Sequence, residues 1–279
     1  MINIKFQPVI KWSGSKRSQS EDIVNKFPKE INTYYEPFVG GASILRQLIH
    51  SNIRVNKYIC SDINNDLISL WNKIKEEPKF LIEEYTRMWN ELNQDEDLER
   101  KKQYYYSVRR RFNESKQPQD FLFISRTTTN GLIRYNQKGE FNNSFHVTRK
   151  GIEPKRLEKI LLEWSELLNK NNVEFINRSY IDIEPQEGDF VYLDPPYAGT
   201  KGMYYGTIDY EELWRWLKNI KCGFALSFDG TCGSEDRTYD VPKNIYDKHE
   251  YIYSGCSSFK RLKEQKVEYV KESLYLKIG

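Results

Sequence analysis

The segment VYLDPPYAGT, residues 191–200, constrains the fold more than any other part of the chain. Its apolar start is typical of a buried strand. Proline has no N–H to donate to a sheet ladder, so Pro195 and Pro196 must end that strand. Asp194 is therefore expected as its last residue, with Tyr197 just beyond on a stiff turn. Because ligands of open α/β sheets bind at the carboxyl ends of strands, the segment predicts a small site.

The regions on either side of this segment alternate strands and helices, the rhythm of βαβ units in a parallel sheet. Before it, we expect strands at 33–39 and 57–63 with a helix at 42–52 between them. After about residue 154 the alternation returns, with helices at 154–170 and 209–220 and strands at 173–177, 189–197, 224–229, 251–255 and 272–278.

The middle of the chain has a different pattern. Residues 66–93 and 97–115 show long, charged helical patterns, interrupted near Pro78 and ended near Pro118. Residues 131–145 then alternate around a Lys-Gly pair, which indicates a hairpin. We therefore predict an α/β, Rossmann-like core formed by residues 1–65 and 155–279, with a mostly helical domain, residues 66–154, inserted into it.

The overall composition indicates less about binding partners than the local sequence patterns do. The net charge is only +3, from 43 basic and 40 acidic residues, and does not by itself predict nucleic acid. Residues 100–112, RKKQYYYSVRRRF, interleave basic and aromatic side chains, which suits phosphates and bases but equally a solvated helix face. No apolar run approaches the roughly 20 residues of a membrane span, and the N-terminus lacks a signal-peptide layout. The four cysteines lack the close paired spacing of a metal site or a disulfide framework. Taken together, these features predict a cytoplasmic protein with no metal and no membrane partner.

A glycine pair follows the first predicted strand and precedes a helix. Gly40 and Gly41 allow a tight turn and close approach of a ligand, although the dinucleotide fingerprint G-x-G-x-x-G is missing. Asp62 ends the next strand, where an acid grips ribose hydroxyls in nucleoside-binding sheets. A glycine pair alone, or an acid at a strand end alone, more often has a purely structural role. Together they indicate an adenosine-containing ligand, and S-adenosylmethionine fits.

Five blocks then occur in an order and spacing that resemble one family. They are KWSGSKR from Lys11, EPFVGGAS, SDINNDLISLWN, NGLIRYNQKGEFN and YLDPPY. The chain resembles the Dam-like, alpha-group (D12 class) DNA adenine-specific methyltransferases over nearly its whole length, more weakly at 75–120 and after 205. The resemblance implies site-specific methylation of adenine in double-stranded DNA, with S-adenosylmethionine as donor, S-adenosylhomocysteine as product and no metal.

The resemblance also implies roles for residues at matching positions. The cofactor residues would be Trp12, Lys16, Glu36, Phe38, Gly40, Gly41, Asp62 and Asp194; Ala42 stands where many members have glycine and is small enough to be tolerated. The catalytic residues would be Asp194, Pro195, Pro196 and Tyr197.

The tetrapeptide suits the chemistry of an exocyclic amine, whose lone pair is delocalised into the adenine ring. The Asp194 carboxylate and the Pro195 carbonyl could accept the two amine hydrogens and direct the nitrogen lone pair toward the methyl group. Tyr197 would stack on an adenine flipped out of the duplex.

The insertion would be the target-recognition domain. Arg134 is the first candidate for contacting a base, because bidentate arginine–guanine pairing is the commonest specific contact. Further DNA candidates are Lys11, Asn130, Asn136, Arg109, Arg110 and Arg111. Thr129 stands where relatives that recognise GATC carry an aromatic wedge, and Ser144 and His146 replace their usual proline and glycine. These departures predict a recognition sequence other than GATC.

Other hypotheses stay open. The same cofactor and fold could methylate RNA adenine or a protein amide, although a glutamine methylator more typically has Asn before the prolines. A DNA-binding module without activity and an NAD oxidoreductase are disfavoured by the intact tetrapeptide and the missing fingerprint. We expect a monomer on DNA in a bacterial or phage-encoded setting, with a restriction endonuclease as a functional partner in a restriction-modification system.

Overall fold

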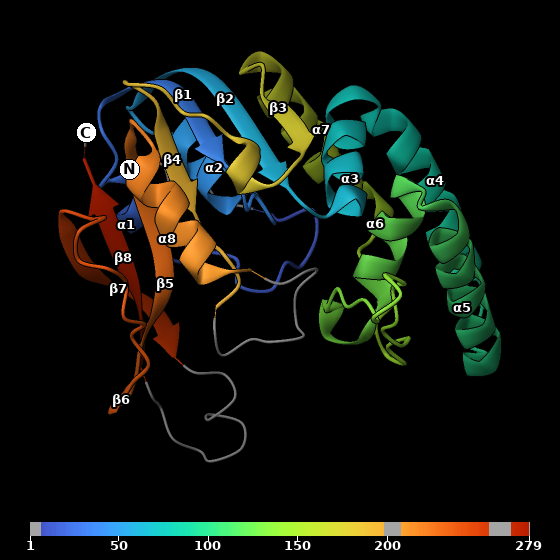
Figure 1. Cartoon of the computed structure of the whole chain (residues 1–279). Coiled ribbons are helices and arrows are strands. Elements are labelled where there is room, and N and C mark those ends of the chain that lie inside the picture. Colours follow the sequence, from blue (N-terminus) through green and yellow to red (C-terminus); the bar gives the residue numbers. More distant parts are fainter. Residues whose placement is uncertain (1–6, 198–207, 257–268, 279) are drawn as a thin grey trace. The chain divides into compact units, whose positions relative to one another are not determined.

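The computed structural model describes residues 7–197, 208–256 and 269–278 (Figure 1). The chain divides into two compact units. The first, which we call the sheet unit, comprises Lys16–Ile63 and Ile176–Gly279. The second, the helical unit, comprises Asn64–Phe175 and the N-terminal stretch through Ser15.

The sheet unit is built on a mixed sheet with the strand order β3-β2-β1-β4-β5-β8-β7, while β6 pairs with β5. Strands β2, β1, β4 and β5 run parallel, and β8 and β7 add an antiparallel edge. The chain leaves β1 toward β2 and later returns to β4 on the other side of β1, which makes the β1–β4 boundary the topological switch point. The strands are β1 (Glu30–Glu36), β2 (Arg54–Asp62), β3 (Glu174–Asn177), β4 (Phe190–Leu193), β5 (Gly223–Cys232), β6 (Glu235–Asp236), β7 (Lys248–Cys256) and β8 (Tyr269–Lys277).

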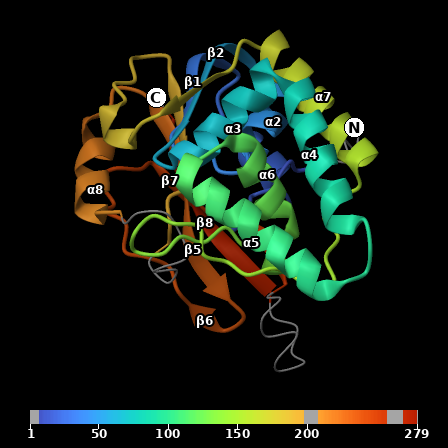
Figure 2. The same cartoon turned by 90° about the vertical axis from the view of Figure 1, so that its right-hand side faces the viewer.

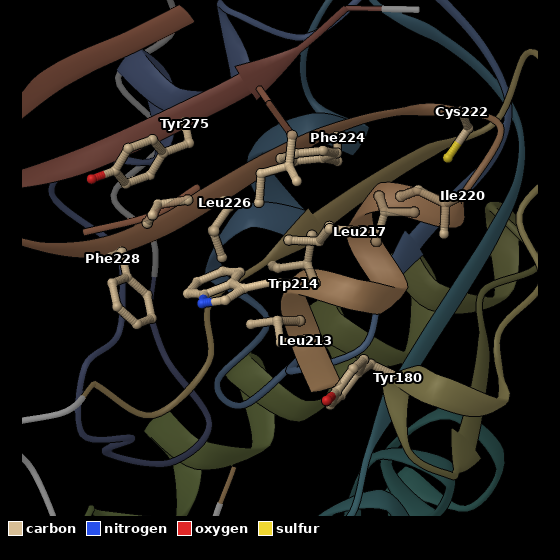
Figure 3. Close-up of a cluster of buried hydrophobic side chains, with 14 residues drawn as sticks. Tyr180, Leu213, Trp214, Leu217, Ile220, Cys222, Phe224, Leu226, Phe228 and Tyr275 are labelled. Atoms are coloured by element: carbon tan, nitrogen blue, oxygen red, sulfur yellow. The ribbon is translucent and has the colours of Figure 1, made fainter. Parts of the chain in front are cut away.

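Strand β4 is buried on both faces, as expected for the centre of a parallel sheet. Val191 and Leu193 belong to an apolar cluster with Trp214 and Phe228 (Figure 3). The alternate residue Phe190 faces the other way, where its ring lies 4.7 Å from that of Phe27. Because successive side chains of a strand point to opposite faces, β4 contributes to the apolar core on both sides of the sheet.

Three α-helices cover the sheet: α1 (Ser20–Val24), α2 (Ser43–Ile49) and α8 (Tyr210–Asn219). Figures 1 and 2 show α2 and α8 on opposite faces. Helix α8 begins at the Asp209 cap, whose carboxylate accepts from the backbone N–H groups of Glu211 and Glu212. It buries Leu213, Trp214 and Leu217 against the sheet.

Among its described residues, the helical unit contains five α-helices, a short 3-10 turn and a long loop. Helices α3 and α7 pack through Trp71 and Trp164, whose rings lie 4.8 Å apart. Both α4 and α6 begin with proline at the first helical position, where no N–H is missed. The elements are α3 (Asn65–Glu76), α4 (Pro78–Asn93), α5 (Leu98–Ser115), α6 (Pro118–Thr127), η1 (Thr129–Gly131) and α7 (Pro154–Lys170).

The α/β core predicted from the sequence is confirmed, and each helix and strand predicted for it overlaps an observed one. The strand predicted at 189–197 ends earlier, at Leu193, so Asp194 directly follows the strand and is not its last residue. The observed units differ from the predicted boundaries at 66 and 154 in two places, because the stretch through Ser15 and helix α7 both belong to the helical unit. Helix α7 packs on α3 and α4. The predicted hairpin is present but irregular: Tyr135 bridges Phe141 and Thr128 bridges Phe145, without a continuous ladder. Across the described ranges, no helix is both long and apolar enough to cross a membrane.

Candidate active site

Three acidic residues follow one another along the carboxyl edge of the sheet. Glu36 is the last residue of β1, Asp62 the last of β2, and Asp194 comes directly after β4. Since these three strands are neighbours and parallel, their ends share one edge of the sheet at the switch point. This is the position at which open α/β sheets bind ligands.

Glu36 is almost fully buried, with 2% of its surface exposed. The Tyr34 hydroxyl donates to its Oε2 at 2.8 Å, and its carboxylate also accepts from the backbone N–H of Leu45 in the first turn of α2. Burial raises the pKa of Glu36 to about 8, although these hydrogen bonds act in the opposite direction. Glu36 therefore ties β1 to α2 beneath the glycine turn.

The glycine turn is held against the end of β2. The backbone N–H of Gly40 points to Asp62 Oδ2 at 3.4 Å, and Val39 donates to the Ser61 carbonyl at 3.0 Å. Gly40 has φ 46°, and the non-glycine Ala42 also adopts the left-handed region, with φ 54°. Alanine is thus accommodated as predicted, at a strain of roughly 1 kcal/mol. Asp62 and the turn together form a cradle of the kind that nucleosides occupy.

Asp194 lies in a cluster of charged and hydroxyl groups. The Lys16 ammonium is 2.8 Å from Asp194 Oδ1 and 3.2 Å from Glu272 Oε2. The Tyr197 hydroxyl lies 3.2 Å from Asp194 Oδ1 and 2.9 Å from Glu272 Oε2. Lys16 Nζ also lies 4.9 Å from the centre of the Tyr197 ring. One lysine and one tyrosine are thus shared between two carboxylates.

Burial and charge set the protonation of this cluster. Burial raises the pKa of Asp194 to about 6, while Lys16 counteracts it. Burial acts to lower the pKa of Lys16, but the charges of Asp194 and Glu272 outweigh it and the pKa is raised. The pKa of Glu272 is lowered: burial favours the neutral form, but Lys16 and the hydrogen bonds to the carboxylate prevail. At neutral pH the cluster therefore holds one positive and two negative charges.

The turn after β4 is anchored from α8. The Tyr210 hydroxyl donates to the Pro196 carbonyl at 2.8 Å. The Tyr197 ring packs at 5.5 Å from Phe228 of β5. These contacts hold the tetrapeptide in place, in agreement with the stiffness that its two prolines impose.

The other predicted cofactor residues lie in different places. Phe38, partly buried, packs 5.6 Å from the Tyr180 ring, and Gly41 is partly exposed in the turn. Trp12 is partly buried in the helical unit. Among the described residues, no group of three or more His, Cys, Asp or Glu side chains is arranged to hold a metal ion.

In the helical unit, the predicted recognition hairpin is fixed to α5 and η1. Asn113 accepts from the backbone N–H of Phe141 and donates to its carbonyl. Asn143 donates to the carbonyls of Thr129 and Leu132, and the Thr129 hydroxyl lies 3.0 Å from that of Ser144. The hairpin is therefore a fixed scaffold.

The DNA candidates differ in how their side chains are used. Arg134 is exposed at the hairpin, and Asn130 takes φ 56° in η1. Asn136 instead caps the turn, because its side-chain Oδ1 accepts hydrogen bonds from the backbone N–H groups of Lys138 and Glu140. Lys11 packs against Gly131, where an added Cβ would lie 2.7 Å from Lys11 Cδ.

The three consecutive arginines of α5 also have separate roles. Arg110 is exposed. Arg109 donates to the Asn143 carbonyl at 3.0 Å, and Arg111 makes two hydrogen bonds to the buried Asp120. Arg110 thus remains the best placed of the three for phosphate.

The sequence interpretation missed Glu272 and Tyr210, which contact the site from β8 and α8, and Tyr34, which contacts Glu36 within β1. One signal could have indicated Glu272. It is an acid at the start of a predicted apolar strand, ESLYLKI, as unusual there as Asp194 is at the end of another.

An open sheet with a glycine turn and acids at its switch point belongs to the class of α/β proteins whose ligands bind at the carboxyl edge of the sheet. The chain belongs to the D12 class N6 adenine-specific DNA methyltransferases, whose family model matches residues 12–268. The predicted resemblance is therefore confirmed, and with it the class of enzyme.

Two relatives in amino-acid sequence support this assignment. The chain is 36% identical over 213 residues to the Type II methyltransferase M.MjaIII of Methanocaldococcus jannaschii, covering 70% of each chain. It is 36% identical over 200 residues to the DNA adenine methylase of Escherichia coli (strain K12), covering 70% of this chain and 66% of that protein. Among solved structures, the rRNA methyltransferase aviRa from Streptomyces viridochromogenes matches with a TM-score of 0.35 and 12% identity, covering 92% of this chain and 80% of that one.

Proposed function

We propose that this chain transfers a methyl group from S-adenosylmethionine to the exocyclic 6-amino group of a flipped adenine in double-stranded DNA. The observation that carries the proposal is the position of Asp194. It follows a buried strand at the switch point of the sheet, and Lys16, Tyr197 and Glu272 hold its carboxylate and the groups around it. Family membership supplies the class of substrate.

The residues at the sheet edge fit the cofactor. Asp62 at the end of β2 would accept from ribose hydroxyls, and the turn at Gly40 and Gly41 would let the ligand approach the backbone. Phe38 would add an apolar contact from the sheet unit. Trp12 lies in the helical unit, and its contact with the cofactor stays a prediction from the family resemblance. S-adenosylmethionine supplies a methyl group made electrophilic by its sulfonium. Because Glu36 is buried beneath the turn, we assign it the support of the cradle rather than direct contact.

The residues of the tetrapeptide would prepare the amine. The Asp194 carboxylate and the Pro195 carbonyl would accept its two hydrogens, and Tyr197 would stack on the base. The amine nitrogen would form a bond to the methyl carbon as the methyl–sulfur bond of the donor breaks and leaves S-adenosylhomocysteine. The nitrogen would then carry a positive charge and lose one proton. Asp194, whose pKa burial raises to about 6, would take that proton and pass it to water.

The helical unit would recognise the DNA. Arg134 would contact a guanine, with Lys11 and Asn130 beside the same hairpin, and Arg110 would contact phosphate. Arg109, Arg111 and Asn136 would support these contacts, because their side chains already bind within the unit. The small Thr129, held to Ser144, supplies no aromatic wedge, which supports a target other than GATC.

The biological setting is also a proposal. Relatives named Type II methyltransferases support a partnership with a restriction endonuclease, and their bacterial and archaeal sources support action in the cytoplasm of a prokaryotic or phage-infected cell. We propose that the protein acts on DNA as a monomer.

The test is to incubate the protein with methyl-labelled S-adenosylmethionine and separate pools of DNA, RNA and protein. We expect label in DNA, recovered as N6-methyladenine, and none with Asp194→Ala. Label in RNA or protein alone would contradict the proposal and favour the corresponding amine substrate.

A further inference from the structure

We propose that Glu272 is a positioning residue for methyl transfer: from β8 it holds Lys16 and Tyr197 and keeps the site around Asp194 net negative. This inference rests on the proposed function. Glu272 lies on β8, an antiparallel strand between β5 and β7, whereas the other acids lie at or directly after the ends of parallel strands.

The contacts place Glu272 where it controls two of Asp194's partners. Its Oε2 lies 3.2 Å from the Lys16 ammonium and 2.9 Å from the Tyr197 hydroxyl, while its Oε1 accepts from Ser254 at 3.0 Å. The side chain is 17% exposed, so water weakens these interactions little. A packing residue of the same size would not need a charge at this place.

The lysine explains why a second carboxylate is useful. Lys16 lies 2.8 Å from Asp194 Oδ1, the group that must accept from the adenine amine. With Asp194 as its sole counter-charge, the ammonium would hold that carboxylate and oppose the positive charge that develops on the amine nitrogen. Glu272 gives Lys16 a second partner and leaves one net negative charge, which favours the developing positive charge.

The ionisable groups around Asp194 come from several elements, and each could affect its titration. Lys16 and Tyr197 contact it directly, and Glu272 acts from β8. Two further groups that interact with it are Glu36 at the end of β1 and Tyr192 of β4. Among these, Glu272 can be neutralised without removing a group from the tetrapeptide or the glycine turn.

The experiment measures single-turnover methylation of DNA against pH for the wild type and Glu272→Gln. Glutamine keeps the size and loses the charge. We expect the plateau rate to fall at least tenfold, on the scale of losing a preorganised electrostatic contact. Loss of a negative neighbour also lowers the pKa of Asp194, so the acid limb of the rate should move to lower pH. Affinities for S-adenosylmethionine and DNA should change less than threefold.

Glu250→Gln is the matched control. Glu250 lies on the adjacent strand β7, is 20% exposed and is likewise shared between two lysines, Lys26 and Lys248. Glu250→Gln should keep both the plateau rate and the acid limb of the wild-type pH–rate profile.

The outcomes separate the two proposals. A wild-type protein that does not methylate adenine contradicts the proposed function. If the wild type is active and Glu272→Gln has the same plateau rate and the same acid limb, the proposed role of Glu272 is overturned. A lower plateau rate with an unmoved acid limb also overturns it, because that result would indicate packing alone. If Glu272→Gln does not fold, Glu272→Asp decides: it retains the charge and should keep the wild-type limb, and a displaced limb would overturn the proposal.

Discussion

The pH dependence of the rate should report the protonation of Asp194. Burial raises the pKa of this carboxyl to about 6, and the proposed mechanism requires the ionised form to accept from the amine. A single group with that pKa is about 90% ionised at pH 7, half ionised near pH 6 and about 10% ionised at pH 5. The methylation rate should therefore fall about tenfold between pH 7 and pH 5.

The assay is single-turnover methylation with saturating S-adenosylmethionine and DNA, so that binding does not mask the chemical step. Circular dichroism at each pH verifies that the protein stays folded. Glu36→Gln is a useful control, since it removes another titrating carboxyl near Asp194 and should keep a limb on the acid side of neutrality. A carboxyl with an ordinary pKa would still be about 90% ionised at pH 5. A rate unchanged from pH 7 to pH 5 would therefore refute the reasoning.

Further predictions concern stability, cofactor and DNA. The folded-state pKa of Glu36, raised to about 8, makes its stabilising effect greatest at low pH and lost as pH rises toward 8. The contribution of Glu36 to the free energy of unfolding should therefore drop by about 3 kcal/mol from pH 4 to pH 7, and the difference between the wild type and Glu36→Gln in denaturant titrations should change by that amount. Asp62→Ala should weaken S-adenosylmethionine binding by about 1–3 kcal/mol in calorimetry, and unchanged affinity would remove the ribose assignment. Arg134→Ala should relax discrimination at one base position by about 1–3 kcal/mol, which methylation mapping would show. Arg110→Ala should instead weaken binding to all DNA sequences alike and reduce the slope of affinity against salt by about one, which salt titration would show. An unchanged recognition sequence for Arg134→Ala would exclude the hairpin as the recognition element.

Sequence alone predicted the features that depend on local signals. The prolines after Asp194 fix the end of β4, and the pattern of residues 154–170 gives α7 because Pro154 and the apolar spacing specify a helix locally. The glycine turn and Asp62 were predicted together because βαβ order brings adjacent strand ends to one edge.

What sequence could not predict depends on tertiary pairing. Glu272 reaches the site because β8 pairs antiparallel with β5 in one register, and a shift by one residue would turn its side chain to the other face. Asn136 was a candidate for contacting a base, but its side chain caps the hairpin turn, a choice that local sequence leaves open. Helix α7 follows the predicted insertion in sequence but packs on its helices, because its apolar face is complementary to α3 and α4.

The most direct test of the account is the product formed by the purified protein. Duplex DNA incubated with S-adenosylmethionine, digested to nucleosides and analysed by mass spectrometry should contain N6-methyladenine, at defined sites, for the wild type and for Glu250→Gln. Asp194→Ala should yield none while it still binds DNA and keeps the wild-type circular dichroism spectrum. Undiminished N6-methyladenine from a folded Asp194→Ala variant, or methylation of a base other than adenine by the wild type, would contradict the account.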